Sequence, residues 1–153
     1  LRGIFKSHWS LFCDFKIICR DGETVIAPKL ILVAHSDYFS ALLNHEPETT
    51  TISLPQFNSA LVKFVIKSLV DFDENDFDDV ELGQVVSVAD YFMMKELVAI
   101  ISDVIITKLT TENLQVVLDL NQTVHSPNLE EGCVSFIKAN IQEIFKNVWI
   151  PRS

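Results

Sequence analysis

The sequence predicts an α+β fold, in which a small β-sheet of about three strands is flanked by a cluster of helices and followed by a C-terminal helix pair. Two observations lead to this class. Residues that favour strands lie on both sides of Asp21-Gly22, a strong hairpin-turn signal, and apolar residues recur at helical spacing through most of the remaining chain. A third short strand is expected at residues 52–54, where Pro55 ends it.

The hairpin and the helices after it are predicted from local signals. The strands span residues 14–20 and 23–27 on the two sides of the turn. Pro28 then ends the pairing, and it suits the first turn of a helix because its missing N–H would have no partner there. One short helix is expected over residues 29–34 and a second over residues 37–44, with Ser36 as its N-cap.

The second half of the chain has the pattern of a helical region. Apolar spacing predicts helices over residues 60–70, 82–94 and 95–109. Thr110 or Thr111 is expected to cap the next helix. Ser126-Pro127 opens the last one, whose apolar face runs from Leu129 to Phe145.

An amphipathic helix is also predicted at the N-terminus, over residues 1–9. It is too short to bury its own apolar side chains, so it must dock on the rest of the chain or on a partner. Those side chains are Leu1, Ile4, Phe5 and Trp9. Because the first residue is Leu1 and not methionine, we expect the chain to be part of a longer protein.

Composition narrows the functional classes. A chain of 153 residues that is 48% hydrophobic can bury a core, and its net charge of −9 disfavours binding to nucleic acid through phosphates. No apolar run reaches the roughly 18 residues that span a bilayer, so no membrane partner is expected. Three cysteines without paired spacing fit a reducing compartment, which indicates the cytoplasm or the nucleus.

The acidic run over residues 71–81 holds seven of the 21 acidic residues. Asp71, Asp73 and Asn75 match the first ligand positions of a calcium loop. However, Asp76 stands where that loop needs glycine, and Leu82 where it needs a bidentate glutamate. A solvated acidic loop is therefore expected. Because no metal-ligand spacing, phosphate-binding glycine loop or nucleophile elbow occurs either, we expect no cofactor, no metal and no enzyme activity.

A spaced pattern across the first two-thirds of the chain resembles the BTB/POZ domain family. Residues 1–109 resemble that domain, and residues 110–148 resemble the 3-box that follows it in cullin adaptors. The matching residues are Phe12-Cys13-Asp14 before the hairpin, Ala27, Lys29, Leu32, Ala34, Ser36, Tyr38, Phe39, Ala41, Leu42 and Leu43 after it, and VVSVADYFMM at residues 85–94. Pro28 departs from the histidine that is usual in the family.

The resemblance implies an interaction module that homodimerises and recruits a cullin-3-type scaffold through the scaffold's N-terminal domain. The full protein would then be a substrate adaptor for ubiquitin transfer, with the substrate held by a domain outside these residues. The implied dimer interface includes Leu1, Ile4, Phe5, Trp9, Asp14, Lys29 and Leu32. The implied cullin interface includes Tyr38, Phe39, Leu42, Leu43, Glu46, Tyr91 and Phe92.

One departure bears directly on the cullin interface. Cullin-binding members carry a hydrophobic-x-Glu motif, whereas this chain has the longer spacing Leu43-Asn44-His45-Glu46. Three alternatives stay open: a BTB dimerisation and cofactor-recruitment domain of a transcriptional regulator without cullin binding, a monomeric elongin-type adaptor, and an enzyme. The added helix pair disfavours the first alternative, and the apolar N-terminal helix disfavours the second.

Overall fold

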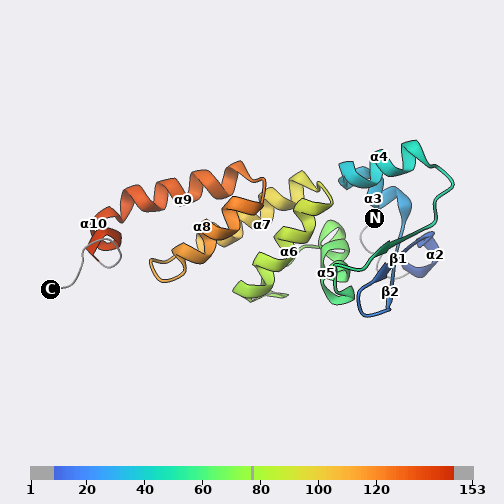
Figure 1. Ribbon diagram of the computed structural model, residues 1–153, viewed down its shortest axis with the longest axis horizontal. Helices are drawn as coiled ribbons and strands as arrows, with labels where there is room; N and C mark the ends of the chain where they lie inside the picture. The colour runs from blue at the N-terminus through green and yellow to red at the C-terminus, as the bar shows by residue number, and fades with distance from the viewer. Residues whose placement is uncertain (1–8, 77, 147–153) are drawn as a thin grey trace.

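The computed structural model describes residues 9–76 and 78–146. The sheet lies at one end of an elongated molecule, longer helices occupy the middle, and the C-terminal helices extend to the other end (Figure 1). The elements in chain order are α2 (Trp9–Phe12), β1 (Phe15–Cys19), β2 (Thr24–Ala27), α3 (Lys29–His35), α4 (Asp37–His45), β3 (Thr51–Leu54), α5 (Ser59–Val70), the 3₁₀ helix η1 (Glu74–Asp76), α6 (Asp79–Tyr91), α7 (Lys95–Thr107), α8 (Leu114–Thr123), α9 (Pro127–Ala139) and α10 (Ile141–Ile144). This arrangement is the predicted α+β class.

The three strands form one sheet in the order β2-β1-β3. β1 pairs with β2 in antiparallel register, with Phe15 opposite Ala27, and with β3 in parallel register, with Lys16 opposite Thr51. The hairpin turns at Gly22, whose φ of 78° lies in the left-handed region that glycine adopts without steric cost. Alternate β1 residues are buried, so one face of the sheet covers the core.

A hydrogen bond ties the hairpin turn to α5. The Ser59 hydroxyl donates to Asp21 Oδ2 at 2.6 Å. This bond favours the charged carboxylate, and it is the main reason why the pKa of Asp21 lies below its usual value.

Several helix starts are fixed by short polar contacts. Ser36 accepts a hydrogen bond from the Phe39 N–H, which confirms it as the N-cap of α4. At α6, residues 78 and 81 form a complete capping box. α3 begins at Lys29, as predicted, with Pro28 as its N-cap residue. Asp14 satisfies the first donor of the helix, because its side chain accepts from the Lys29 N–H at 2.7 Å.

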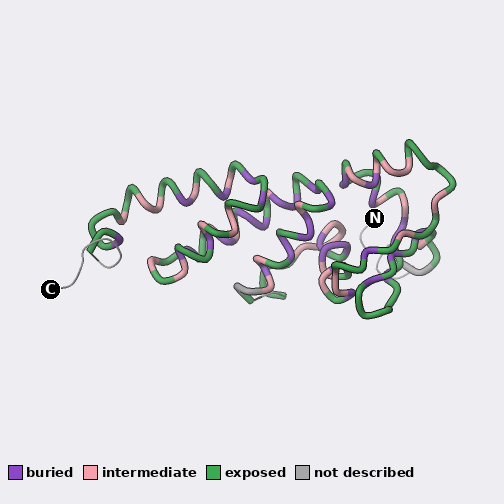
Figure 2. The backbone as a smooth tube through the Cα atoms, viewed as in Figure 1, coloured by how far each residue is buried: buried purple, intermediate pink, exposed green. Residues whose placement is uncertain are grey.

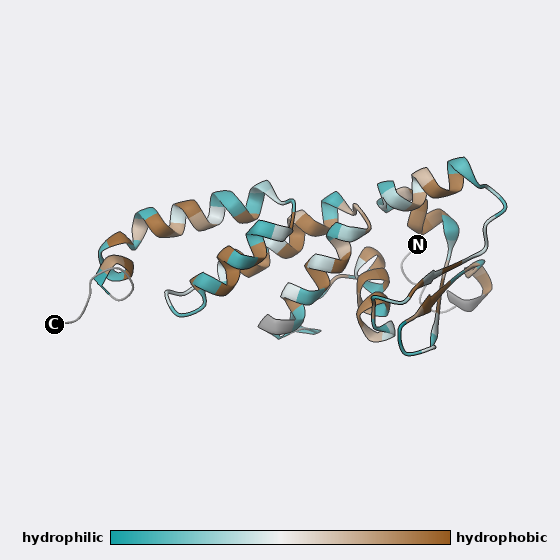
Figure 3. Ribbon diagram, in the orientation of Figure 1, coloured by the Kyte–Doolittle hydropathy of each residue, from teal (hydrophilic) through white to brown (hydrophobic). Residues whose placement is uncertain are grey.

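Buried residues run from the sheet through the middle helices to the packed sides of α7, α8 and α9 (Figure 2). The inward face of β1 packs against aromatic and aliphatic side chains of the helices, and these inner surfaces carry hydrophobic residues (Figure 3). The largest fully buried side chains include Phe15, Ile17, Leu32, Phe39, Leu82, Phe92 and Ile101. Within the part of the chain that the structure describes, no helix combines the length and the apolar character that a membrane span requires.

The C-terminal helices attach to the rest of the protein through α7, which packs against both α6 and α9 (Figure 1). At the α7–α9 contact the buried Ser126 hydroxyl donates to the Ser102 hydroxyl at 2.7 Å and accepts from the Leu129 N–H at 3.2 Å. Gly132 makes a closer approach, since a Cβ at that position would lie less than 3.0 Å from side-chain carbons of Ile106.

Replacing Gly132 with alanine is therefore expected to lower the free energy of unfolding by about 1–3 kcal/mol, because the added methyl overpacks the α7–α9 contact. Urea denaturation would measure the change. The matched control is Gly83→Ala in α6, where a Cβ would lie 4.0 Å from Leu120, an ordinary contact. That control should gain roughly 0.5–1 kcal/mol, since alanine is more favourable than glycine inside a helix. Equal stability of the two variants would contradict the close contact.

The start of α8 differs from the prediction. The helix begins at Leu114, later than a cap at Thr110 or Thr111 implies. Thr110 pairs reciprocally with Asn113 instead, accepting from its N–H at 3.2 Å and donating its own N–H to the Asn113 side chain at 2.7 Å. This pair closes a turn that precedes the helix.

The end of the last predicted helix is also different. α9 ends at Ala139, and α10 follows as a separate short helix. The Asn140 side chain donates to the Phe136 carbonyl at 2.9 Å, a local bond of the kind that competes with helix continuation. The apolar face predicted to run unbroken to Phe145 is therefore divided at Asn140. The amphipathic helix predicted over residues 1–9 lies almost wholly outside the described residues.

Candidate interaction surfaces

The first candidate surface joins the start of α4 to the turn between α6 and α7. The Ser36 hydroxyl donates to the Phe92 carbonyl at 2.5 Å while it caps α4. The Asp37 N–H donates to the Met93 carbonyl at 3.3 Å. These two hydrogen bonds join the start of α4 to the turn between α6 and α7. They hold the two segments together although the segments are far apart in sequence.

An aromatic cluster lies beneath this surface. Phe39 and Phe92 are fully buried, and their ring centroids are 5.1 Å apart. They support Tyr38 and Tyr91, whose ring centroids are 5.6 Å from each other, and Phe57 packs edge-on against Tyr91 with a centroid distance of 4.9 Å. The structure thus brings four of the predicted cullin-interface residues together, with Phe57 as a member that the sequence did not indicate.

Two of those four predictions need correction. Phe39 and Phe92 have no exposed surface, so they cannot contact a partner directly. In this position they fix the orientation of the tyrosines above them. Tyr91 is 41% exposed, and Tyr38 is partly exposed. Burial, followed by the nearby Tyr91 phenol, raises the pKa of Tyr38, so its hydroxyl keeps its proton.

Met93 extends the surface, and sequence reasoning did not find it. The predicted helix over residues 82–94 ends at Tyr91, and Met93 follows with a φ of 54°. The Met94 N–H donates to the Ala89 carbonyl at 3.0 Å, which closes the helix end around a left-handed residue. Glycine would be the usual residue there, but the chain places a methionine that is 50% exposed.

The C-terminal end of α4 carries the remaining predicted cullin contacts. Leu42 and Leu43 are partly buried against the core, and Glu46 is exposed just beyond the helix. The Glu46 N–H donates to the Leu42 carbonyl at 2.8 Å, while its carboxylate accepts from the Thr49 hydroxyl at 3.4 Å. Leu43 and Glu46 therefore lie at the same end of α4 despite their longer sequence spacing.

A groove continues this surface toward the C-terminal helices. Next to Tyr91 and Met93 lies a cavity of about 470 Å³, and a second cavity of about 630 Å³ begins at the same Lys95 and reaches the start of α9. His125 lines both cavities. Asp90 positions it by accepting from its backbone N–H at 3.1 Å, and the Asp90 carboxylate also lies 3.1 Å from His125 Nδ1.

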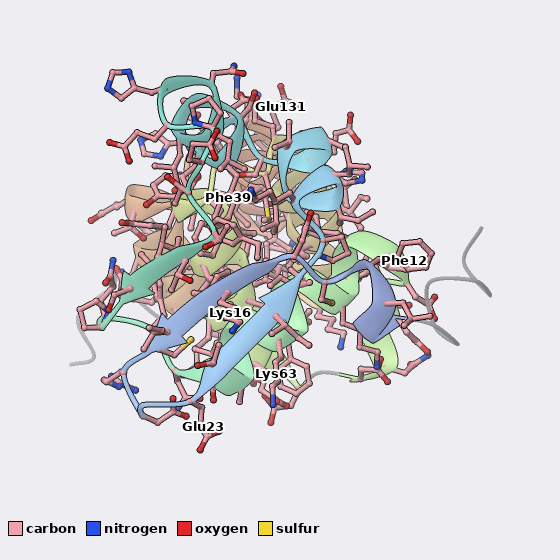
Figure 4. All side chains as sticks on the ribbon, turned by 90° about the vertical axis from the view of Figure 1, so that its right-hand side faces the viewer. Phe12, Lys16, Glu23, Phe39, Lys63 and Glu131 are labelled. Carbon is pink, nitrogen blue, oxygen red and sulfur yellow. The ribbon has the colours of Figure 1, made fainter. Side chains whose placement is uncertain are left out.

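The second candidate surface is the apolar face of α2 and α3. Leu11 on α2 is 78% exposed and Leu30 on α3 is 83% exposed. α2 packs beside β2, and α3 follows β2 directly along the chain. Figure 4 shows the Phe12 side chain on the outside of this end of the molecule, whereas Phe39 lies inside it.

The predicted dimer residues are only partly on this face. Asp14 and Lys29 lie at its edge, where they form the start of α3. Leu32 is fully buried, so its prediction as a contact residue is wrong: it faces the core while Leu30 faces outward. Leu1, Ile4 and Phe5, and the side chain of Trp9, lie outside the described part of the chain.

The described residues do not assemble a metal centre. Across residues 9–76 and 78–146, no three histidine, cysteine, aspartate or glutamate side chains converge as an ion would require. In the acidic run, Asp73 Oδ1 instead accepts from the N–H and the side-chain amide of Asn75, both at 3.0 Å. The Asp73 carboxylate is thus used within its own loop.

Comparison with known proteins identifies the family of this fold. No curated protein matches the chain. Among solved structures, the BTB (Tramtrack and Bric a brac) domain of human Gigaxonin is similar, with a TM-score of 0.50 and 25% sequence identity over 63% of this chain and 80% of that chain. The family model of the BTB/POZ domain matches residues 4–109, which is more than half of the sequence. The chain therefore belongs to the BTB/POZ domain family.

Proposed function

We propose that this BTB/POZ domain homodimerises and recruits a cullin-3-type scaffold, as part of a substrate adaptor for ubiquitin transfer. BTB domains are protein–protein interaction modules. The observation that supports scaffold recruitment best is the rigid, partly exposed group of Tyr38, Tyr91 and Met93 at the mouth of a groove. The substrate is held by another domain of the full protein.

The scaffold surface has the properties of an interface centre. Tyrosine and methionine are enriched in interfaces, and contacts that are already rigid lose little entropy when they bind. The buried Phe39 and Phe92 supply that rigidity, because they pack beneath the tyrosines. Leu43 and Glu46 extend the same surface and take the place of the usual hydrophobic-x-Glu motif.

The groove gives the C-terminal helices a role in the same interaction. We assign residues 110–148 to a 3-box, and the loop between α8 and α9 forms one wall of the groove. An extended segment at the N-terminus of the scaffold would lie there. This wall favours the adaptor over a transcriptional regulator without cullin binding, because the added helices have no role in that alternative.

Dimerisation is supported by the apolar face of α2 and α3. Leu11 and Leu30 leave most of their surface in water in the single chain, and both belong to elements at the sheet end of the molecule. Covering these side chains with a partner would remove apolar surface from water. In our proposal a second copy of the chain covers these residues, whereas a monomeric elongin-type adaptor would leave them in water. The three cysteines, which lack paired spacing, fit a protein of the cytoplasm or the nucleus.

Light scattering on the isolated chain, followed by titration with the N-terminal domain of a cullin-3-type scaffold, tests the proposal. We expect a dimer that binds one scaffold domain per protomer. A dimer without scaffold binding would favour the transcriptional-regulator alternative.

A further inference from the structure

An apolar pocket lies at the end of the α6–α7 pair that is remote from the proposed scaffold surface. Its volume is about 240 Å³, and α6, α7 and α8 each contribute to its walls. The large apolar residues of its lining are Leu82, Ile105, Val116, Val117 and Leu120. A cavity of roughly 150 Å³ with such a lining holds a benzene molecule, so this pocket has room for one large apolar side chain.

Gly83 leaves this pocket open, although the fold does not need a glycine there. Its backbone lies outside the left-handed region, and a Cβ would meet Leu120 only at 4.0 Å. Glycine inside a helix is less favourable than alanine by about 0.5–1 kcal/mol. Gly132, in contrast, is required by the close approach of Ile106. Glycine at position 83 therefore lowers the stability of the helix relative to alanine, and it leaves the apolar pocket between α6, α7 and α8 unfilled.

Acidic residues adjoin the lining of the pocket along the chain. The seven acidic residues of segment 71–81 end immediately before Leu82, and Glu112 and Asp119 are the neighbours of lining residues on the α8 side. Lys108 is the basic residue in the lining. Val116, at the mouth, is 69% exposed and would be covered by an occupant.

We propose that this pocket binds one large apolar side chain of a partner segment in which lysine or arginine residues flank that side chain. The apolar side chain anchors the segment, and the acidic residues that adjoin the lining along the chain attract its basic residues and speed association. The pocket shares no residue with either surface of the proposed function. Peptide binding in this pocket can therefore fail without affecting scaffold recruitment, and the reverse.

Nuclear magnetic resonance of the full chain, titrated with short capped peptides, tests this assignment. The probe peptide carries one central phenylalanine between lysines. We expect the methyl signals of Val116, Val117 and Leu120 to shift saturably as peptide is added. The affinity derived from these shifts should fall as the salt concentration is raised. Two comparison peptides, one with alanine at the centre and one with glutamates in place of the lysines, should bind at least about tenfold more weakly.

Gly83→Leu provides the sharpest variant, because the new side chain fills the pocket. It should be at least as stable as the natural chain, since leucine is a better helix former than glycine, and should lose peptide affinity by about tenfold or more. Val116→Lys, a change at an exposed position, should weaken binding without affecting the fold.

Four outcomes would overturn the proposal. The first is that Gly83→Leu and Val116→Lys bind the probe peptide as tightly as the natural chain, and the second is that the comparison peptides bind as tightly as the probe. The third is that the methyl signals do not shift even at high peptide concentration. The fourth is that, without any peptide, the methyl signals shift as the protein concentration is raised. The last outcome would identify a second copy of the chain as the occupant.

Discussion

Leu30→Asp is expected to convert the proposed dimer into a monomer and to leave the fold of each chain unchanged. Leu30 is 83% exposed on α3 in the single chain, so a carboxylate there stays hydrated when the protein is monomeric. In the dimer the same charge would be buried without a partner, which costs several kcal/mol and weakens association by about a hundredfold or more. Light scattering would report the change in mass, and circular dichroism the retained helix content.

The control for this variant is Val134→Asp on α9, which adds the same charge at another exposed apolar position. It should remain dimeric. Persistence of the Leu30→Asp dimer, or dissociation of both variants alike, would mean that the apolar face of α2 and α3 is not the dimer interface.

Met93→Asp is expected to reduce scaffold affinity by more than about tenfold and to leave dimerisation unchanged. Aspartate tolerates the left-handed backbone at this position better than most residues, so the helix end should persist. The lost affinity then reflects a charge placed in an apolar contact. Calorimetric titration with the scaffold domain would measure it.

Met93→Gly separates the side chain from the backbone. Glycine relieves the left-handed strain, so this variant should gain roughly 0.5–1 kcal/mol of stability and still bind the scaffold more weakly. If both Met93 variants bind like the natural chain, the turn between α6 and α7 is not part of the interface.

Local signals were enough for much of the fold. The Asp21-Gly22 turn determines the position of the hairpin, because Gly22 itself adopts the left-handed φ that such a turn requires. The caps at Ser36 and Ser126 were also predictable, since each accepts a hydrogen bond from an N–H three residues later in the chain. These features depend on short stretches of sequence, so they hold before any tertiary contact is known.

Which apolar residues face a partner could not be predicted in the same way. Five consecutive apolar residues, 30–34, occupy α3, and periodicity alone does not indicate which of them is buried. The structure buries Leu32 and exposes Leu30 because its neighbours, α4 and α5 among them, cover only one side of the helix. The same ambiguity explains why the sequence predicts Phe39 at a surface although the fold buries it.

The site residues that were missed depend on tertiary structure. Met93 carries no sequence signal of a helix end, because the position lacks the glycine that usually marks it. Phe57 lies in the loop after β3, and only the fold places it against Tyr91. The groove that reaches from Tyr91 to the start of α9 joins residues that are distant in sequence, such as Asp90 and His125.

In our proposed function, one surface of a BTB dimer holds a cullin-3-type scaffold. The most direct test of this proposal is calorimetric titration of the dimer with the N-terminal domain of that scaffold, with the mass of the complex measured by light scattering. Saturable binding of one scaffold domain per protomer is the predicted result. A stable, folded chain that shows no heat of binding and no increase in mass would contradict it.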